Sequence, residues 1–576
     1  MRFTTTTILL AALFLACARL TAAGVESNDL RRPILPADRQ TPRREQLSRL
    51  QEAWARTNLG EVARLHGQLS GEALQTALRT ARAWEAMRDP ETGLIPDSPD
   101  KTFWYVSNTG ADCLPFLWEA YRELNPERAP FWYEVFEIDR RLCGVLPQTV
   151  HFRPTRLETG TVYEQLFGGA EYIKDGLVAM AERYGRGPWF ERMEEVAQEV
   201  NRRAPIATAR GPIPGEDTEI NGDLLIYLPR LYWATRNPTY LEMAQRIADL
   251  YLLDLLPRTG QLPPLYWDFA RNRLGRHVHA GLVKYRDHGN ELIFGLTELY
   301  FLERQMRLPA AERHAAPLRA MLDRILVVGR TPDGLWYDAA RISNGEAKPR
   351  VIDTWGYLLN ALQTFDLAEG TNRYAAEIQR AMRAAAGRKS FEWERQHQDG
   401  YADALEGMMY MLPWFDLPEC RAWVDDEMEV LYGFQHPDGF VNRTYLDGNF
   451  IRTVLLYARY KAQGTRARPW RADVELGAVR DPVDGSLVVH LAAGQAWAGR
   501  LSLDPPMHRD LWGMPQNYPR INAPPQWFPV AAETPFTVEG LNNAPRRVTG
   551  ADLQAGLPVS LAAGESRTIR IRFSPP

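Results

Sequence analysis

The sequence predicts a mainly α fold, an (α/α) toroid of six or seven helical hairpins with a small C-terminal antiparallel β-sandwich domain. Helical periodicity recurs in pairs of segments between residues 71 and 463. Loops rich in Pro, Gly and aromatic residues lead into the second helices of the pairs, as in DPETGLIPDS, TPDGLWYDA and HPDGFVNRT. After residue 464 the helical period gives way to short strand-like segments. Repeated hairpins bury their apolar faces against their neighbours, so a ring of hairpins is expected.

Residues 1–23 have the pattern of a secretory signal peptide: an early basic residue, a short apolar run, and small residues before a cleavage site at Gly24. The apolar run is too short to stay in a bilayer, and no other segment approaches ~20 consecutive apolar residues. Lipid attachment at Cys17 is the alternative, and Phe14 disfavours it. We therefore expect a secreted or periplasmic protein without a membrane span. Residues 24–70 are expected to form a leader and a first helix.

Within the predicted toroid, residues 71–463, the two helices of each pair differ in composition. The first carries more Arg, Glu and Gln, and the second is more apolar. This difference predicts an outer ring that faces water and an inner ring that is packed on both sides. The predicted pairs are 71–88 with 108–124, 131–145 with 165–184, 189–203 with 220–235, 238–254 with 289–306, 311–328 with 351–367, 371–387 with 399–414, and 418–433 with 447–463.

Residues 464–576 are expected to form the β domain, because short segments such as SLVVHLAA and SRTIRIRF alternate with Gly, Pro and Asp turns. A Trp- and Pro-rich stretch that begins at Leu511 interrupts these strands. Such a stretch suits either a carbohydrate-contacting loop or a segment that docks the β domain on the toroid. Docking is the favoured interpretation.

Composition excludes several classes of function. A net charge of −4 leaves no basic face for nucleic acid. The phosphate-binding, dinucleotide-binding and GxSxG motifs are absent, and no Cys or His cluster has zinc spacing, so neither a cofactor nor a metal is assigned. Cys113 and Cys143 could form a disulfide or remain buried thiols. The 17 Trp and 23 Tyr exceed ordinary core packing and suggest platforms for sugar rings, although packing must account for at least half of them.

The starts of the second helices concentrate carboxylates, amides, Tyr, Trp, Arg and His. Unpaired backbone NH groups and the positive end of the helix dipole point in the same direction there. Ordinary N-capping explains any single Asp, Asn or Ser at such a position. Capping does not explain the clustering over several repeats, which predicts a shared polar funnel.

Helix starts such as DTWGYLL and DGYADALEGMMYML, together with the PDG loops, resemble the (α/α)-toroid, six-hairpin-glycosidase-like superfamily over roughly residues 71–463. That resemblance implies a carbohydrate substrate. Members of the superfamily include glycoside hydrolases, unsaturated-uronyl hydrolases, polysaccharide lyases and epimerases. Seven predicted hairpins depart from six, so either an extra N-terminal pair or a sevenfold ring is expected.

The segment HVHAGLVKYRDHGNELIFGL, from His277, carries the densest chemistry. These residues could also have structural roles alone. Asp287 would then cap the helix, Glu291 would form a buried ion pair, and His288 would pack in the core. The predicted catalytic residues here are Asp287, His288 and Glu291. The predicted substrate-binding residues here are Tyr285, Arg286 and Asn290.

A second group lies in GEDTEINGD, where Asp217 and Glu219 are predicted to be catalytic. Clustered carboxylates raise one another's pKa when enclosed, and a protonated carboxyl group can protonate a glycosidic oxygen. A solvated acidic loop or an incidental calcium loop is the alternative. Further along, Asp353 is a predicted catalytic base. The remaining predicted substrate-binding residues are Trp355, Tyr357, Asp399 and Tyr401.

The leading hypothesis is a secreted glycoside hydrolase that uses paired carboxylates on an oligo- or polysaccharide, with uronate-containing substrates included. The first alternative is a polysaccharide lyase, in which Tyr285 or His288 removes a proton while Asn290 and Arg286 neutralise a uronate carboxylate. A non-catalytic glycan-binding surface protein is the second alternative. Fold alone does not separate the three.

Overall fold

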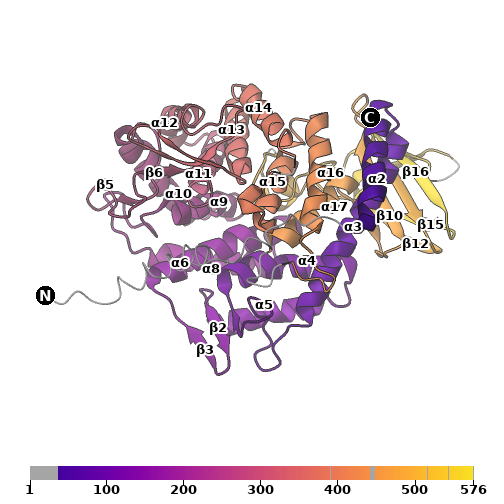
Figure 1. Cartoon of the computed structure of the whole chain (residues 1–576), viewed down its shortest axis with the longest axis horizontal. Coiled ribbons are helices and arrows are strands. Elements are labelled where there is room, and N and C mark those ends of the chain that lie inside the picture. Colours follow the sequence, from indigo (N-terminus) through magenta and orange to yellow (C-terminus); the bar gives the residue numbers. More distant parts are fainter. Residues whose placement is uncertain (1–36, 390, 442–447, 515–516, 542–543, 575–576) are drawn as a thin grey trace. The chain divides into compact units, whose positions relative to one another are not determined.

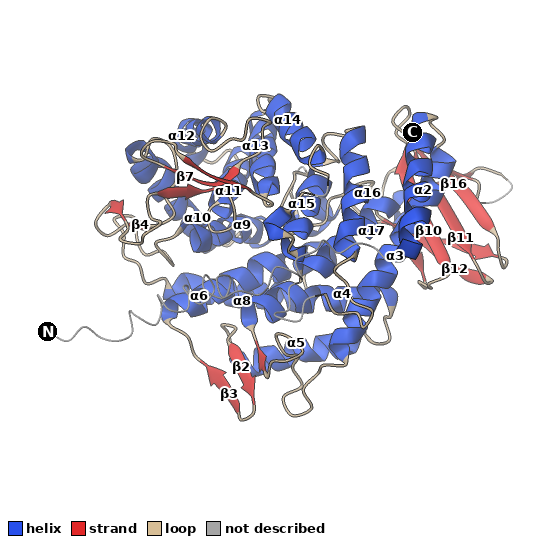
Figure 2. Cartoon of the chain, viewed as in Figure 1, coloured by secondary structure: helices blue, strands red, loops and turns tan. Residues whose placement is uncertain are grey.

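The computed structural model describes residues 37–574, apart from residue 390 and the segments 442–447, 515–516 and 542–543. The predictions for the signal peptide and for Cys17 lie outside the described residues. None of the helices described has the length and apolar character that a membrane span requires. The predicted fold class is confirmed, because most elements are helices and the larger antiparallel sheet lies in the C-terminal part of the chain (Figure 2).

In the described part of the chain, seven helical hairpins form the ring (Figure 1). Each inner helix contacts the next along the chain, and the last contacts the first, which closes the ring. The inner helices are η1–α4 (Val106–Cys113 and Leu114–Leu124), α6–η2–α7 (Val162–Glu171, Tyr172–Leu177 and Val178–Tyr184), α9 (Thr218–Thr235), α11 (Asn290–Gln305), α13 (Trp355–Glu369), α15 (Gln398–Met411) and α17 (Asn449–Ala462). The outer helices are α3 (Leu59–Glu85), α5 (Ala129–Cys143), α8 (Pro188–Arg203), α10 (Pro238–Asp249), α12 (Ala310–Ile325), α14 (Ala375–Ala386) and α16 (Pro418–Tyr432).

Burial separates the two rings as their composition predicts. The outer helix α14 buries one stripe, with Ile378, Met382 and Ala385 at helical spacing, and leaves its Arg residues outside. The inner helix α11 buries every residue from Asn290 to Glu303. A helix that is apolar on all sides must be covered on all sides, so it belongs to the inner ring.

Glycines let neighbouring inner helices approach closely. A Cβ atom on Gly222 of α9 would stand 2.4 Å from the backbone nitrogen of Leu292 in α11. A Cβ atom on Gly356 of α13 would stand 2.4 Å from Cα of Gly407 in α15. Both approaches involve backbone atoms, which cannot turn aside as a side chain can, so these positions hold adjacent helices at short range.

The first outer helix begins earlier than predicted. Helix α3 starts at Leu59 rather than near residue 71, and the first helix predicted within residues 24–70 is α2 (Ala37–Ala55). The side chain of Asn58 accepts a hydrogen bond from the backbone nitrogen of Glu61 at 3.2 Å and caps α3. The cap determines where α3 begins. The spacing of apolar residues continues from α2 into α3, so it does not mark the boundary between the two helices.

Short antiparallel strands occupy several loops that lead into the inner helices, where the sequence predicted loops alone. They form small sheets before α4, α6, α11 and α13. The strands are β1 (Phe103–Trp104), β2 (Thr149–Phe152), β3 (Thr155–Glu158), β4 (Trp267–Asp268), β5 (Arg273–Leu274), β6 (Leu282–Lys284), β7 (Tyr337–Arg341) and β8 (Ala347–Val351).

Two antiparallel sheets make up the C-terminal domain, and their apolar side chains share a core separate from that of the toroid. The larger sheet has the order β10 (Val474–Arg480), β11 (Leu487–Ala493), β16 (Ser566–Phe573), β13 (Pro535–Glu539), β14 (Arg546–Thr549). The smaller sheet has the order β15 (Leu557–Leu561), β12 (Trp497–Leu503), β9 (Thr465–Arg468). β10 lies directly on α3, where a Cβ atom on Gly477 would stand 2.1 Å from the backbone nitrogen of Gly67.

The Trp- and Pro-rich stretch docks on the toroid, as favoured from the sequence. The Tyr518 hydroxyl donates to Glu298 of α11 at 3.2 Å, and the Arg520 guanidinium donates to Glu182 of α7 at 2.9 Å. Both acidic residues lie in the C-terminal halves of their helices. The stretch therefore lies at the end of the ring opposite the starts of the inner helices.

The predicted alternatives for Cys113 and Cys143 are resolved in favour of buried thiols. Both side chains are buried, and no disulfide joins them. The Cys143 thiol donates to Asp139 at 3.3 Å, and burial raises its pKa. A buried thiol of this kind packs as a small apolar side chain.

Candidate active site

The starts of α9 and α11 bring together the two most polar segments of the sequence. Asp217 caps α9, and its Oδ1 accepts a hydrogen bond from the backbone nitrogen of Ile220 at 3.0 Å. The Thr218 hydroxyl donates to the backbone carbonyl of His288. The Glu219 carboxylate is hydrogen-bonded to Nδ1 of His288. These contacts hold the two segments against each other.

Burial and the nearby Glu219 carboxylate raise the pKa of Asp217 to about 6. Glu219 also raises the pKa of His288 to about 9, against the opposite effect of burial. His288 is therefore protonated at neutral pH. Its side chain is 52% exposed, whereas that of Glu219 is 13% exposed, so the imidazolium forms the outer member of the pair.

Arg286 links three carboxylates beside this pair. Its Nε lies 3.2 Å from Oδ1 of Asp353 and 3.5 Å from Oδ2 of Asp287, and its guanidinium also pairs with Glu394. Burial alone would raise the pKa of Asp287, but the charges of Arg286 and His288 outweigh it and lower that pKa. Asp287 is thus ionised at neutral pH, with a third of its side chain exposed. Asp353 is fully buried, and burial raises its pKa.

A buried lysine that sequence reasoning missed lies at the centre of the ring. Nζ of Lys174, in η2, lies 3.4 Å from Asp175 and 3.6 Å from Asp223. Burial raises the pKa of Glu291 to about 8, although Lys174 opposes the change. Burial likewise raises the pKa of Glu171 to about 7. The available signal was the polar run YIKDG inside an otherwise apolar helix. It follows, two residues on, the helix start TVYEQLFGG, whose polar signal is weaker than that of the other starts.

Four predicted substrate-binding residues are buried in the structure. Tyr285 and Tyr401 are buried, and their hydroxyls donate to backbone carbonyls at 2.8 and 2.7 Å. Trp355 is also fully buried. A buried ring offers no face to a sugar that arrives from solvent. Asn290 is buried as well, and its amide donates to the Thr354 hydroxyl at 2.9 Å, which ties α11 to α13.

Tyr357 and Asp399 remain close to the charged groups. Burial raises the pKa of Tyr357, and the charges of Lys174 and Glu291 act on it from nearby. Asp399 accepts a hydrogen bond from Asn449, which joins the starts of α15 and α17. Both residues therefore remain candidates for contact with a substrate.

Two tyrosines beside Asp217 were not identified from the sequence. The Tyr163 phenol lies near Asp217 and acts to lower the pKa of that carboxyl group, and the Tyr163 residue is 40% exposed. Burial and the charge of Asp217 raise the pKa of Tyr266 to about 12. An exposed ring next to a polar group is a suitable platform for a sugar face. Tyr163 belongs to the weakest helix start, and Tyr266 lies in a loop with no repeat signature.

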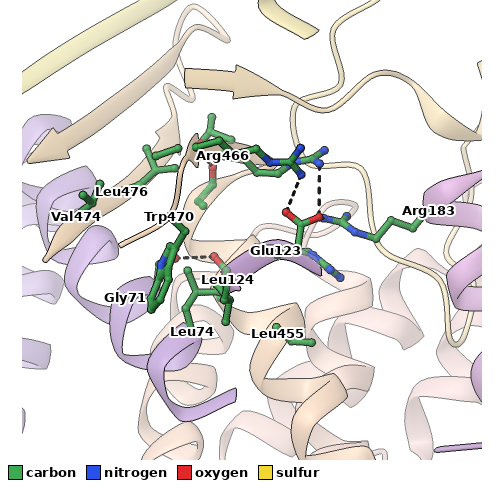
Figure 3. A pocket seen from close by; sticks show the side chains of 17 residues that line it. Gly71, Leu74, Glu123, Leu124, Arg183, Leu455, Arg466, Trp470, Val474 and Leu476 are labelled. Carbon is green, nitrogen blue, oxygen red and sulfur yellow. Dashed lines mark hydrogen bonds and ion pairs between the residues drawn. The ribbon is translucent and has the colours of Figure 1, made fainter. Parts of the chain in front are cut away.

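A cavity lined mainly by apolar residues lies between the toroid and the β domain (Figure 3). Its walls include Leu74, Leu455 and Trp470, and Glu123 pairs with Arg183 at its edge. None of the predicted site residues lines it. The cavity therefore belongs to the interface of α3 and α17 with the β domain, away from the starts of α9 and α11.

The site combines carboxyl groups of different proton affinity. Asp217 and Glu291 hold a proton to higher pH than an ordinary carboxyl group, whereas Asp287 gives its proton up more readily. Environments that push the pKa values of neighbouring carboxyl groups apart supply both an acid and a base at one pH. General acid–base catalysis requires such a combination.

No family model matches the sequence, and no curated protein matches it significantly. Among solved structures, an unsaturated glucuronyl hydrolase from Bacillus sp. is 13% identical, with a TM-score of 0.37 over 52% of this chain and 87% of that chain. A variant of the α-1,6-mannanase of Salegentibacter sp. is 10% identical, with a TM-score of 0.38 over 68% and 98%. Cellobiose 2-epimerase from Bacillus thermoamylovorans is 10% identical, with a TM-score of 0.38 over 68% and 98%.

Proposed function

We propose that the chain is a carbohydrate-active enzyme, a glycoside hydrolase that acts on an oligo- or polysaccharide. The observation that carries this proposal is the meeting of Asp217, Glu219, Asp287 and His288 where α9 and α11 begin. The partly exposed ring of Tyr163 lies beside Asp217. Two carboxyl groups beside a partly exposed aromatic ring match what glycoside cleavage requires.

In this proposal Asp217 protonates the leaving oxygen, because its raised pKa of about 6 keeps a proton available near neutral pH. Asp287 activates water or attacks the sugar carbon, since Arg286 and His288 keep it ionised. Glu219 holds His288 in its charged form. Asp353, first considered as the base, is buried and engaged by Arg286, so it serves to position that guanidinium.

No observation favours the lyase alternative. Tyr285 cannot act as its base, because the ring is buried and its hydroxyl donates to a backbone carbonyl. His288 is a poor base at neutral pH, because Glu219 keeps it protonated. Arg286 is already engaged by three carboxylates, which leaves less of its charge for a uronate.

The test is incubation with neutral, amino and uronate-containing oligosaccharides, with product detection by reducing ends and by ultraviolet absorbance. Hydrolysis should yield reducing ends without an unsaturated product. Asp287→Asn and Asp217→Asn should each lower kcat by roughly 10²–10⁴-fold, the usual range for general acid–base groups. Asp510→Asn, on the outside of α18 (Met507–Trp512), is the matched control and should retain activity.

Two results would count against the hydrolase. Ultraviolet-absorbing products would establish the lyase. Saturable binding of an oligosaccharide without any product would establish the non-catalytic glycan-binding protein.

The cellular location of the protein and the boundaries of its domains are also proposals. The pattern of residues 1–23 supports secretion or periplasmic export after cleavage before Gly24. N-terminal sequencing of the exported protein tests it, and a first residue other than Gly24 would contradict the proposed cleavage site. We further propose a catalytic domain, predicted over residues 71–463, that begins with α3 at Leu59, and residues 464–576 as the accessory β domain.

A further inference from the structure

A group of metal-ligating side chains lies at the start of α15, next to Arg286. Glu394, His397 and Asp399 each place one ligand atom within 4.8 Å of the others. Glu394 belongs to the short turn η5 (Trp393–Arg395), His397 caps α15, and Asp399 stands in its first turn. Two carboxylates and an imidazole at such separations suit one small cation.

Asp353 lies beside this group without belonging to it. Its Oδ1 accepts from the backbone nitrogen of Thr354 at 3.0 Å and from Arg286 at 3.2 Å. Its Oδ2 is buried and has no hydrogen-bond partner among the described residues, while the whole side chain is 1% exposed. Both Oδ2 of Asp353 and Cβ of Glu394 lie close to Gly400. A Cβ atom added to Gly400 would stand 3.0 Å from the first atom and 2.5 Å from the second, so the two side chains are near each other.

The two carboxylate oxygens of Glu394 have different surroundings. Oε1 pairs with Arg286, whereas Oε2 is buried, without a hydrogen bond in the described part of the chain, and 3.7 Å from Nδ1 of His397. A buried carboxylate oxygen that lacks a partner costs free energy. A cation between Glu394, His397 and Asp399 would remove that cost.

Charge balance favours a divalent ion. The guanidinium of Arg286 is the cation that pairs with Glu394 and Asp353, and it is shared with Asp287. Acidic groups therefore outnumber basic groups around Glu394, His397 and Asp399. An imidazole ligand selects ions of the Mn²⁺ to Zn²⁺ group over Ca²⁺, which takes oxygen ligands.

We propose that Glu394, His397 and Asp399 bind one divalent transition-metal ion, with the buried oxygen of Asp353 behind them. The ion would hold η5 and the start of α15 in place. Because Glu394 also engages Arg286, this would fix the guanidinium that faces Asp287. Neither Asp217 nor Asp287 is a proposed ligand, so binding of the ion can be measured separately from hydrolysis.

The test is isothermal titration of the full chain, dialysed against a chelator, with Zn²⁺ and separately with Mn²⁺. We expect one site per chain with a Kd of about 10 μM or tighter for at least one ion. His397→Gln and Asp399→Asn should each weaken that site by about tenfold or more. His436→Gln is the matched control, because His436 is exposed and stands outside the group, and it should bind as the unaltered chain does.

A structural measurement keeps the proposal testable if a variant fails to fold. Crystals of the unaltered protein grown with Zn²⁺ or Mn²⁺ should show an anomalous peak between Glu394, His397 and Asp399. A peak only at the exposed pair His277 and His279, or equal affinity in His397→Gln, would overturn the proposal. Loss of the site with unchanged hydrolysis would leave the proposed function intact, and hydrolysis can be absent while the ion still binds.

Discussion

Replacing Glu219 with Gln tests the electrostatic account of the site. The substitution keeps the shape of the side chain and removes the charge that raises the pKa of His288 to about 9 and contributes to raising that of Asp217 to about 6. In Glu219→Gln the pKa of His288 should fall towards its ordinary value of about 6.5, and that of Asp217 should fall towards about 3.9.

The magnitude follows from the shift and from exposure. A rise from 6.5 to about 9 would correspond to ~3.4 kcal/mol if nothing screened the pair. The imidazole is 52% exposed, so solvent reduces the contribution to ~1 kcal/mol. Because the folded pKa is the higher one, this stabilisation is complete below pH 6.5 and is lost as the pH rises through about 9.

NMR titration of the His288 ring and urea unfolding at pH 6 and pH 10 measure both effects. Glu219→Gln should lower the free energy of unfolding by ~1 kcal/mol at pH 6 and by much less at pH 10. Glu533→Gln, on an exposed carboxylate paired with Arg509, is the control and should change neither the His288 titration nor this pH dependence. A His288 pKa that stays near 9 in Glu219→Gln, or an equal loss of stability at both pH values, would refute the reasoning.

Three further substitutions and one control test the packing. Gly222→Ala should destabilise the fold by ~1–3 kcal/mol, because the added Cβ meets the main chain of α11. Gly71→Ala, at a half-buried position of α3 where nothing lies within 4 Å of the added Cβ, should instead stabilise the fold by ~0.5–1 kcal/mol. Equal effects of the two substitutions in urea unfolding would contradict the close approach of α9 and α11. Arg520→Met should lower the free energy of unfolding by ~3–5 kcal/mol, since it leaves Glu182 buried without that ion-pair partner. An unchanged unfolding midpoint would show that this ion pair does not contribute to the stability of the fold. Tyr285→Phe removes one buried hydrogen bond, so it should lower the free energy of unfolding by ~1 kcal/mol and leave kcat unchanged. Loss of activity without loss of stability would instead indicate that Tyr285 acts as a catalytic base.

Periodicity and composition were sufficient to predict the hairpins. The pair predicted at 371–387 and 399–414 is observed as α14 (Ala375–Ala386) and α15 (Gln398–Met411). Apolar spacing records which face of a helix is covered, and the covered fraction separates inner from outer helices. The start of α3 was misplaced because its cap, Asn58, interrupts an apolar pattern that otherwise runs on.

The candidate site was only partly predictable. Asp217, Glu219, Asp287 and His288 were identified because they cluster within two short segments, and the structure brings those segments together. Lys174 was missed, since a single lysine within an apolar helix carries no pattern that shows what it faces.

The sequence by itself determined the local structure: the helical hairpins, their inner and outer members, and the polar starts of the inner helices. These features depend on residues three or four positions apart, so they can be read along the chain. The tertiary structure alone decided that Tyr285, Trp355 and Tyr401 turn into the core and that Arg286 joins Asp353 to Glu394. Burial and charge act through space between segments far apart in the chain, so neither is encoded in local spacing.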